Sequence, residues 1–262
     1  MSEVNEYEPG TFCWEELATT DAAAAKEFYG GLFGWSAADT PAGESMVYTM
    51  LRLDGKDVAA LYGMDPQEQG QMPPHWNSYV AVASADQAAE KAAALGATVV
   101  MAPFDVMDHG RMAVLQDPTG AMVPVWQAGK HIGARLTGQT GTLCWNELAT
   151  PDPARAQEFY TGLFGWTAQT QQMDMGPYTV FLRGSQQAAG MFGLTADMAG
   201  MPPSWMPYFA VADCDASAEK ARALGASIHV GPADIPNIGR FALIQDPQGA
   251  MFSIIRLQPP GE

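Results

Sequence analysis

The stretch Thr11-Phe12-Cys13-Trp14-Glu15-Glu16-Leu17-Ala18-Thr19 returns 131 residues later as Thr142-Leu143-Cys144-Trp145-Asn146-Glu147-Leu148-Ala149-Thr150. Each copy runs on to Glu-Phe-Tyr-x-Gly-Leu-Phe-Gly-Trp, which ends at Trp35 and at Trp166. Later landmarks keep their order, among them Met72-Pro73-Pro74 and its counterpart Met201-Pro202-Pro203. A period this long equals a whole small domain. We therefore predict two modules: residues 1–135, with an N-terminal extension and the linker, and residues 136–262.

The composition favours a compact acidic protein. Of its 262 residues, 47% are hydrophobic and 16% charged, which is enough apolar content for two ordinary cores. The net charge of −16 repels phosphate backbones and anionic lipid head groups. Nucleic acid and membrane surfaces are therefore not expected as partners.

The chain shows no signal for export or membrane insertion. No apolar run approaches the roughly 18 residues that span a bilayer, and the acidic start lacks the basic and apolar regions of a secretory signal. Of the three cysteines, Cys13 and Cys144 occupy equivalent places in separate modules, so reduced thiols are expected. We predict a cytoplasmic protein.

Each module is predicted to contain a strand, a helix and three strands, followed by the same series again. In the first module Asp21 caps a helix that Gly34 ends, and Ser84 caps a second helix that Gly96 ends. The predicted strands cover about 12–18, 46–53, 57–63, 77–83, 97–101, 111–116 and 121–127. Glycine-rich residues 128–139 form the predicted linker.

Two such βαβββ units per module, the Asp21 and Phe28-Tyr29 positions and the closing Asp117-Pro118-x-Gly120 turn resemble the vicinal-oxygen-chelate superfamily. That group holds glyoxalases, bleomycin-resistance proteins and extradiol dioxygenases. The duplicated Leu-Phe-Gly-Trp form is most similar to an actinobacterial two-module, glyoxalase-like subgroup. The resemblance implies an α+β fold in which paired βαβββ units of each module form a curved mixed sheet around a cavity.

The superfamily's metalloenzymes hold a divalent ion with His and Glu, so the resemblance also implies where ligands would stand. Alignment places at those positions Trp14, Ala60, Asn77 and Pro124 in the first module and Trp145, Gly190, Met206 and Ser253 in the second. None of these is a histidine or a carboxylate. We predict no metal and no other cofactor. The alternative is one unusual site that uses His75 and His109.

Alternation along the strands predicts which residues share the cavity. Trp14 and Glu16 fall on one strand face, with Trp145 and Glu147 as their counterparts. The same parity adds residues from the later strands of both modules, and the predicted ligand-binding set is Trp14, Asn77, Tyr79, Arg111, Met122, Trp126, Trp145, Met206, Tyr208, Arg240, Met251 and Ser253. Such an aromatic, thioether-rich lining suits a flat or apolar small molecule. Alternatively, these side chains simply fill the sheet's hollow.

Glu16 and Glu147 are the candidate catalytic residues, because a partly buried carboxylate near aromatic rings can act as a general acid or base. They could instead form ion pairs with Arg111 and Arg240, or these arginines could bind a ligand carboxylate or enolate. Cys13 is predicted to lie on the strand face opposite Trp14, which favours packing over nucleophilic chemistry.

Two functions from different classes remain open. The first is a protein that binds a small, largely apolar or aromatic metabolite in a metal-free cavity. The second is a metal-independent isomerase, lyase or hydroxylase-like enzyme, and a metal-dependent glyoxalase or dioxygenase is a third reading. The tandem chain could be a monomeric pseudo-dimer or a homodimer.

Overall fold

The computed structural model describes residues 3–42, 46–65, 69, 72–173, 176–198 and 200–258. The described residues of the first module form these elements along the chain: β1 (Phe12–Thr19), α1 (Ala22–Phe33), β2 (Ser36–Pro41), β3 (Val47–Leu53), β4 (Lys56–Gly63), β5 (His75–Ala81), α3 (Ala85–Ala94), β6 (Thr98–Val106), β7 (Gly110–Gln116) and β8 (Met122–Ala128). Its strands form one sheet in the order β2-β3-β4-β1-β5-β8-β7-β6.

The second module repeats this arrangement, and its described residues also contain a 3₁₀ turn. Its elements are β9 (Leu143–Thr150), α4 (Pro153–Phe164), β10 (Thr167–Met173), β11 (Gly176–Arg183), β12 (Gln186–Gly193), η1 (Ala196–Met198), β13 (Ser204–Ala210), α5 (Cys214–Ala223), β14 (Ser227–Ile235), β15 (Gly239–Gln245) and β16 (Met251–Leu257). The strand order is again equivalent, β10-β11-β12-β9-β13-β16-β15-β14. The predicted fold class, two α+β modules of paired βαβββ units, is confirmed.

The helix boundaries follow from the predicted caps. The Asp21 carboxylate accepts from the backbone N–H groups of Ala23 and Ala24, and Gly34 ends α1 with a left-handed φ of 77°. Ser84 accepts from the N–H of Gln87 at the start of α3. No helix in the described part of the chain is long and apolar enough to cross a membrane.

Strand β2, which pairs with β3 at the sheet edge, was not among the predicted strands. Five of its six residues are exposed, so neither face carries the apolar alternation that marks a half-buried strand. Its counterpart β10 is equally polar.

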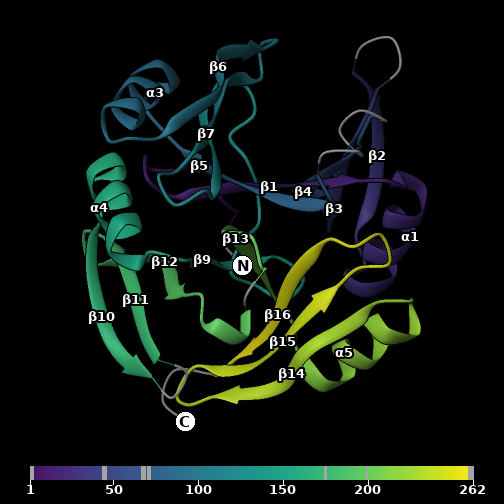
Figure 1. The fold of residues 1–262 in the computed structure, drawn as a ribbon. Coiled ribbons are helices and arrows are strands. Elements are labelled where there is room, and N and C mark those ends of the chain that lie inside the picture. The colour runs from purple at the N-terminus through teal and green to yellow at the C-terminus, as the bar shows by residue number, and fades with distance from the viewer. Residues whose placement is uncertain are drawn as a thin grey trace.

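One face of each sheet, which we call the core face, packs into a single hydrophobic core that both modules share with helices α1, α3, α4 and α5. Helix α1 lies beside α5 of the other module, and α3 lies beside α4 (Figure 1). The Tyr29 hydroxyl donates to Asp246 across the modules at 2.9 Å, and Tyr160 donates to Asp117 at 2.8 Å. The modules are thus related by a pseudo-twofold arrangement inside one chain.

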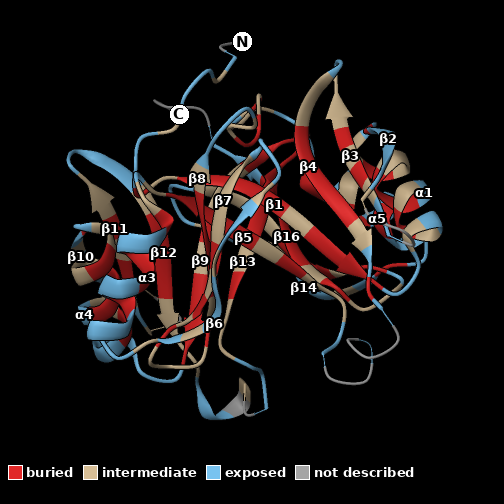
Figure 2. Ribbon diagram, turned by 90° about the horizontal axis from the view of Figure 1, so that it is seen from above, coloured by how far each residue is buried: buried red, intermediate tan, exposed pale blue. Residues whose placement is uncertain are grey.

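The opposite face, here the inner face, is defined by Trp14, Glu16, Tyr48 and Tyr79 in the first module. In Figure 1 the β2–β3 and β6–β7 strands rise at either end of the central strands β1, β4 and β5, so the first sheet is curled. Burial concentrates in these central strands, while the helices expose their outer sides (Figure 2). The inner face of the first module therefore lies on the concave side of the curled sheet.

Candidate functional site

A carboxylate ringed by aromatic groups lies at the centre of the first module's inner face. Tyr48 donates its hydroxyl to Glu16 Oε2 at 2.7 Å, and Tyr79 donates to Oε1 at 2.9 Å. The Trp14 indole N–H in turn donates to the Tyr48 hydroxyl at 3.2 Å. These donors come from β1, β3 and β5, so three strands fix the position of the carboxylate.

The second module builds the same cluster from equivalent residues. Tyr178 and Tyr208 each donate to Glu147 at 2.7 Å, one to each carboxylate oxygen. The Trp145 indole N–H donates to Tyr178 at 3.1 Å. Because two modules of diverged sequence keep the same four residues in the same contacts, the cluster is a defined feature of the fold.

The strand register leaves room for these side chains. Glu147 lies opposite Gly190 on β12 and opposite Met206 on β13. A Cβ at Gly190 would overlap the Tyr178 hydroxyl. In the first module Glu16 is flanked by Ala60 on β4 and by Asn77 on β5.

Burial sets the electrostatics of both clusters. It raises the pKa of Glu16 and of Glu147, while the tyrosine hydroxyls that donate to each carboxylate act in the opposite direction. Burial and the neighbouring carboxylate raise the pKa of all four tyrosines, so the phenols remain hydrogen-bond donors at neutral pH. Both carboxylates stay half-buried and keep some contact with solvent.

The inner faces differ in how they are covered. In the first module Trp14, Tyr79 and Trp126 form a buried cluster with linker residue Ala134. The linker ring of His131 packs edge-on to Trp14, with ring centroids 4.6 Å apart. Trp14 is only 3% exposed, whereas Trp145 is half-buried. The second module therefore has the more accessible inner face.

The structure brings most of the predicted binding residues to the inner faces. Trp126 lies 6.5 Å from Tyr79 between ring centroids, and Ser253 donates to the Met206 sulfur at 3.4 Å. Met122 and Met251, at the starts of β8 and β16, are half-buried. Val123 and Val125 of β8 and Phe252 and Ile254 of β16 pack into the core. Alternation along each strand therefore places Met122 on the same face as Trp126, and Met251 on the same face as Ser253.

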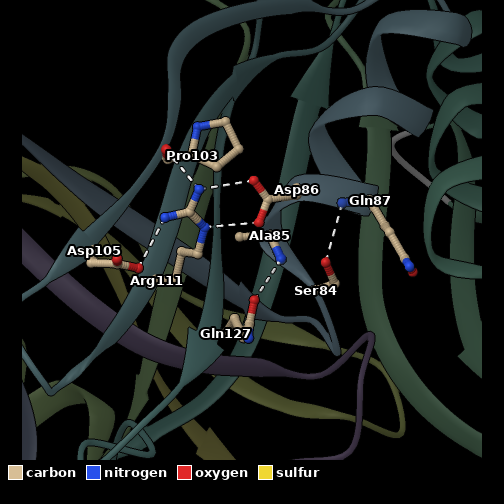
Figure 3. Close-up of polar contacts among 8 residues, drawn as sticks. All are labelled: Ser84, Ala85, Asp86, Gln87, Pro103, Asp105, Arg111 and Gln127. Carbon is tan, nitrogen blue, oxygen red and sulfur yellow. Dashed lines mark hydrogen bonds and ion pairs between the residues drawn. The ribbon is translucent and has the colours of Figure 1, made fainter.

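The alternative in which these glutamates form ion pairs with Arg111 or Arg240 is contradicted by the structure. Arg111 binds Asp86 through two hydrogen bonds of 2.8 Å, and it also binds Asp105 and the Pro103 carbonyl (Figure 3). Its neighbour Met112 packs against the inner-face cluster, so Arg111 points to the helix side of β7. Arg240 is held equivalently by Asp215 and Asp234. Neither arginine joins the Glu16 or Glu147 cluster.

Cys13 also departs from the prediction. A bulge in β1 between Phe12 and Trp14 breaks strict alternation, and Cys13 packs in the same buried cluster as Trp14. Its thiol donates to the Tyr79 carbonyl, and burial raises its pKa. All three cysteines are free. The expectation of packing rather than nucleophilic chemistry agrees with these surroundings.

The residues present do not fit the divalent ion of the superfamily's metalloenzymes. The implied ligand positions carry indole, methyl, amide and proline groups in the first module, and the nearby Glu16 carboxylate is already held by two phenols. Within the described residues no group of three or more His, Cys, Asp or Glu could hold a metal ion. His75 bonds to the Pro73 carbonyl, and His109 lies near Asp108 in a surface turn.

Tyr48 and Tyr178, which donate to the two glutamates, were not among the predicted site residues. The sequence does mark them, because a Tyr-Thr pair occurs at equivalent positions of the two copies, Tyr48-Thr49 and Tyr178-Thr179. Glu15 was also missed, although it is fully buried where the modules meet. The sequence feature that singles out Glu15 is its replacement by Asn146 at the equivalent position of the second copy.

The family model for the glyoxalase, bleomycin resistance protein and dioxygenase superfamily matches residues 12–125 and again residues 141–254. The chain belongs to this superfamily, as the sequence resemblance predicted.

Two groups of relatives resemble nearly the whole chain. A protein of Mycobacterium tuberculosis named "Putative glyoxylase CFP32" is 45% identical over 99% of both chains. The anthracycline biosynthesis protein DnrV of Streptomyces peucetius is 36% identical, over 96% of this chain and 95% of its own.

Solved structures share the fold at low sequence identity. The Mn(II)-bound glyoxalase from Novosphingobium aromaticivorans matches 95% of this chain and 83% of its own, with a TM-score of 0.69 and 15% identity. An extradiol ring-cleaving dioxygenase from B. fuscum matches 99% of this chain and 76% of its own, with a TM-score of 0.67 and 18% identity. These likenesses concern the fold.

Proposed function

We propose that the protein binds a small, flat, largely aromatic metabolite on its inner faces without a metal ion. The observation that carries the proposal is the Trp-Tyr-Tyr-Glu cluster, present in both modules and half-open to solvent in the second. Indole and phenol rings offer apolar surface to a planar ligand. The Glu147 oxygens keep free lone pairs that accept from a ligand hydroxyl or amine. A hydroxylated polycyclic aromatic compound combines both properties.

The names of two relatives support this ligand class. DnrV and DauV are named as anthracycline biosynthesis proteins, and anthracyclines carry a planar, hydroxylated polycyclic ring system. Their 36% identity extends over 96% of this chain. The donor chemistry at the inner faces supports a ligand held by stacking and hydrogen bonds rather than by a cation.

The test is a titration with a dihydroxyanthraquinone, followed by tryptophan fluorescence. We expect saturable quenching, and about tenfold weaker binding for Tyr178→Phe or Glu147→Gln, which matches the loss of one charge-assisted hydrogen bond. Glu158→Gln, an exposed carboxylate on α4, is the matched control and should bind as the unmodified protein does. Absence of quenching across a panel of such aromatics would contradict the proposal, as would stoichiometric zinc, manganese or iron in protein purified without chelator.

A second candidate is an acid–base enzyme acting on the same ligand class. It is favoured by burial, which raises the pKa of Glu147 and of Glu16 and so brings these carboxyls nearer to the range for proton transfer at neutral pH. Here Glu147 would exchange a proton with the ligand while the two tyrosines hold it in place. Turnover lost in Glu147→Gln, at undiminished binding of the aromatic probe, would distinguish this enzyme from a binding protein.

A further inference from the structure

The linker completes the first module by inserting into a gap between two strands. β1 and β4 pair only from Glu16 and Ala60 onward. Before that point the N–H of Ala134 donates to the Cys13 carbonyl of β1 at 2.8 Å, and the N–H of Arg135 donates to the Asp57 carbonyl of β4 at 2.6 Å. Two consecutive residues thus donate to opposite strands, as an extended segment does.

This insertion is close-fitting. Gly133 has a φ of +112°, and a Cβ there would overlap the carbonyl oxygen of Cys13. On its far side the segment accepts from the N–H of Val4, and the Arg135 guanidinium binds Glu3. Glycine at this point is therefore required for the segment to reach β1.

The second module has the same gap, but no described segment fills it. β9 and β12 pair only from Glu147 and Gly190 onward. In the described part of the chain no linker-like segment donates to the carbonyls of Cys144 or Gln187, the counterparts of Cys13 and Asp57. A cavity of about 250 Å³ lies there instead. Its lining includes Cys144 and Trp145 of β9, Gln187 and Ala188 of β12, and Thr11 and Thr137 from the segments beside it.

Two observations mark this cavity as incomplete. Cys144 and Trp145 are half-buried, whereas their counterparts Cys13 and Trp14 are at most 3% exposed. The hydroxyl oxygen of Thr11, which lines the cavity, is buried without a hydrogen-bond partner. A polar atom in this state gains from any donor or acceptor that enters.

We propose that this cavity is a binding site for an extended peptide segment of a partner protein, which enters as residues 133–135 enter the first module. The segment donates consecutive backbone N–H groups to the Cys144 and Gln187 carbonyls, in the manner of strand addition to a sheet. It carries glycine where it passes Cys144 and a small side chain at the next position, as Gly133 and Ala134 do in the linker. A planar aromatic compound lacks this paired set of donors, so the site is distinct in chemistry from the Glu147 cluster.

The probe is acetyl-Ile-Gly-Ala-Arg-Leu-amide, the sequence of residues 132–136, with a fluorescent label for anisotropy. We expect saturable binding with one peptide per chain. N-methylation at both the alanine and the arginine nitrogens removes the donors, and replacing glycine by alanine introduces the overlapping Cβ, so each altered peptide should bind at least about tenfold more weakly.

The protein variants locate the site. Gln187→Trp should block the mouth of the cavity and abolish peptide binding, whereas Gln171→Trp, an exposed glutamine on β10 outside the cavity, should leave it intact. Unchanged thermal unfolding of both variants confirms that the fold is kept. Failure of the peptide to bind at millimolar concentration, equal binding of the N-methylated peptide, or insensitivity to Gln187→Trp would each overturn the proposal. None of these readouts depends on the binding of an aromatic ligand.

Discussion

Asn146 of the second module donates its side-chain amide to Glu15 of the first at 3.0 Å, in a fully enclosed site. The other Glu15 oxygen lies 2.7 Å from the Ser78 hydroxyl, which lies 2.9 Å from the Asn146 amide oxygen. The three groups form a closed ring. With Glu15 protonated, each member donates one proton around the ring. With Glu15 ionised, the single Ser78 proton faces two acceptors. The ring therefore explains why one copy carries glutamate and the other asparagine, since two glutamates could not both be ionised here.

The first prediction is that Glu15 makes stability fall as pH rises. Burial raises the pKa of Glu15 to about 8, so the folded protein keeps a proton that the unfolded chain releases near its ordinary pKa of about 4.3. The contribution is fully present below that ordinary value and is lost as pH rises toward about 8, at up to about 1.4 kcal/mol per pH unit. Glu15→Gln preserves the ring, with its amide in place of the protonated oxygen, and should flatten this dependence.

The measurement is urea unfolding of both proteins at several values between pH 5 and pH 9. Glu158→Gln controls for the loss of a surface carboxylate. If Glu15→Gln and the unmodified protein changed stability in parallel over that interval, Glu15 would not be the titrating group.

The second prediction concerns the tyrosines that join the modules. Tyr160 donates to Asp117 at 2.8 Å and accepts from the Trp205 indole at 2.8 Å, all within the core. Tyr160→Phe leaves a carboxylate oxygen and an N–H unsatisfied, so the free energy of unfolding should drop by about 3 kcal/mol. Tyr29→Phe breaks the equivalent contacts with Asp246 and Trp76 and should cost a similar amount. Urea unfolding checks both, and a loss below about 0.5 kcal/mol would show that these contacts are replaced by water.

The third prediction concerns Gly133, the residue at which the linker passes closest to β1. Gly133→Ala places a Cβ against the Cys13 carbonyl at a left-handed φ, so it should lower the free energy of unfolding by more than about 2 kcal/mol. Gly138→Ala is the matched control, because Gly138 also has positive φ but open space around it, and should cost only about 1 kcal/mol. Equal losses would mean that the close approach at Cys13 contributes nothing.

The sequence predicted the fold well because its strongest signals are local and occur twice. Caps at Asp21 and Ser84 and the apolar strands were found where the structure has them. The β2 strand was missed because an exposed edge strand carries no apolar pattern. The strand face predicted for Cys13 was wrong because β1 contains a bulge. That bulge depends on the pairing with β5, which the sequence of β1 alone does not encode.

The site was predicted only in outline for a similar reason. Trp14, Glu16 and Tyr79 follow from alternation on two adjacent strands. Tyr48 comes from β3, which is separated from β1 by β4, so its approach to Glu16 depends on the curl of the sheet. The partner of Arg111 depends on how α3 packs against the sheet, because that packing brings Asp86 to the guanidinium, and the local sequence pattern does not encode it.

The fourth prediction tests whether the linker closes the first inner face. His131 lies edge-on to Trp14 and, at 5.9 Å between centroids, to Trp126, and burial lowers its pKa to about 4, so the ring is neutral at pH 7. His131→Ala removes the ring that covers Trp14, and acrylamide should then quench a larger fraction of the tryptophan fluorescence. His229→Ala, an exposed histidine on β14, should leave quenching unchanged. Because the linker covers the first inner face, the proposed function predicts one aromatic probe per chain for the unmodified protein, on the second inner face, and two per chain for His131→Ala. Quenching and stoichiometry that both matched the unmodified protein would show that the first inner face is closed by its own packing, with Tyr79 and Trp126 filling the space, rather than by the linker.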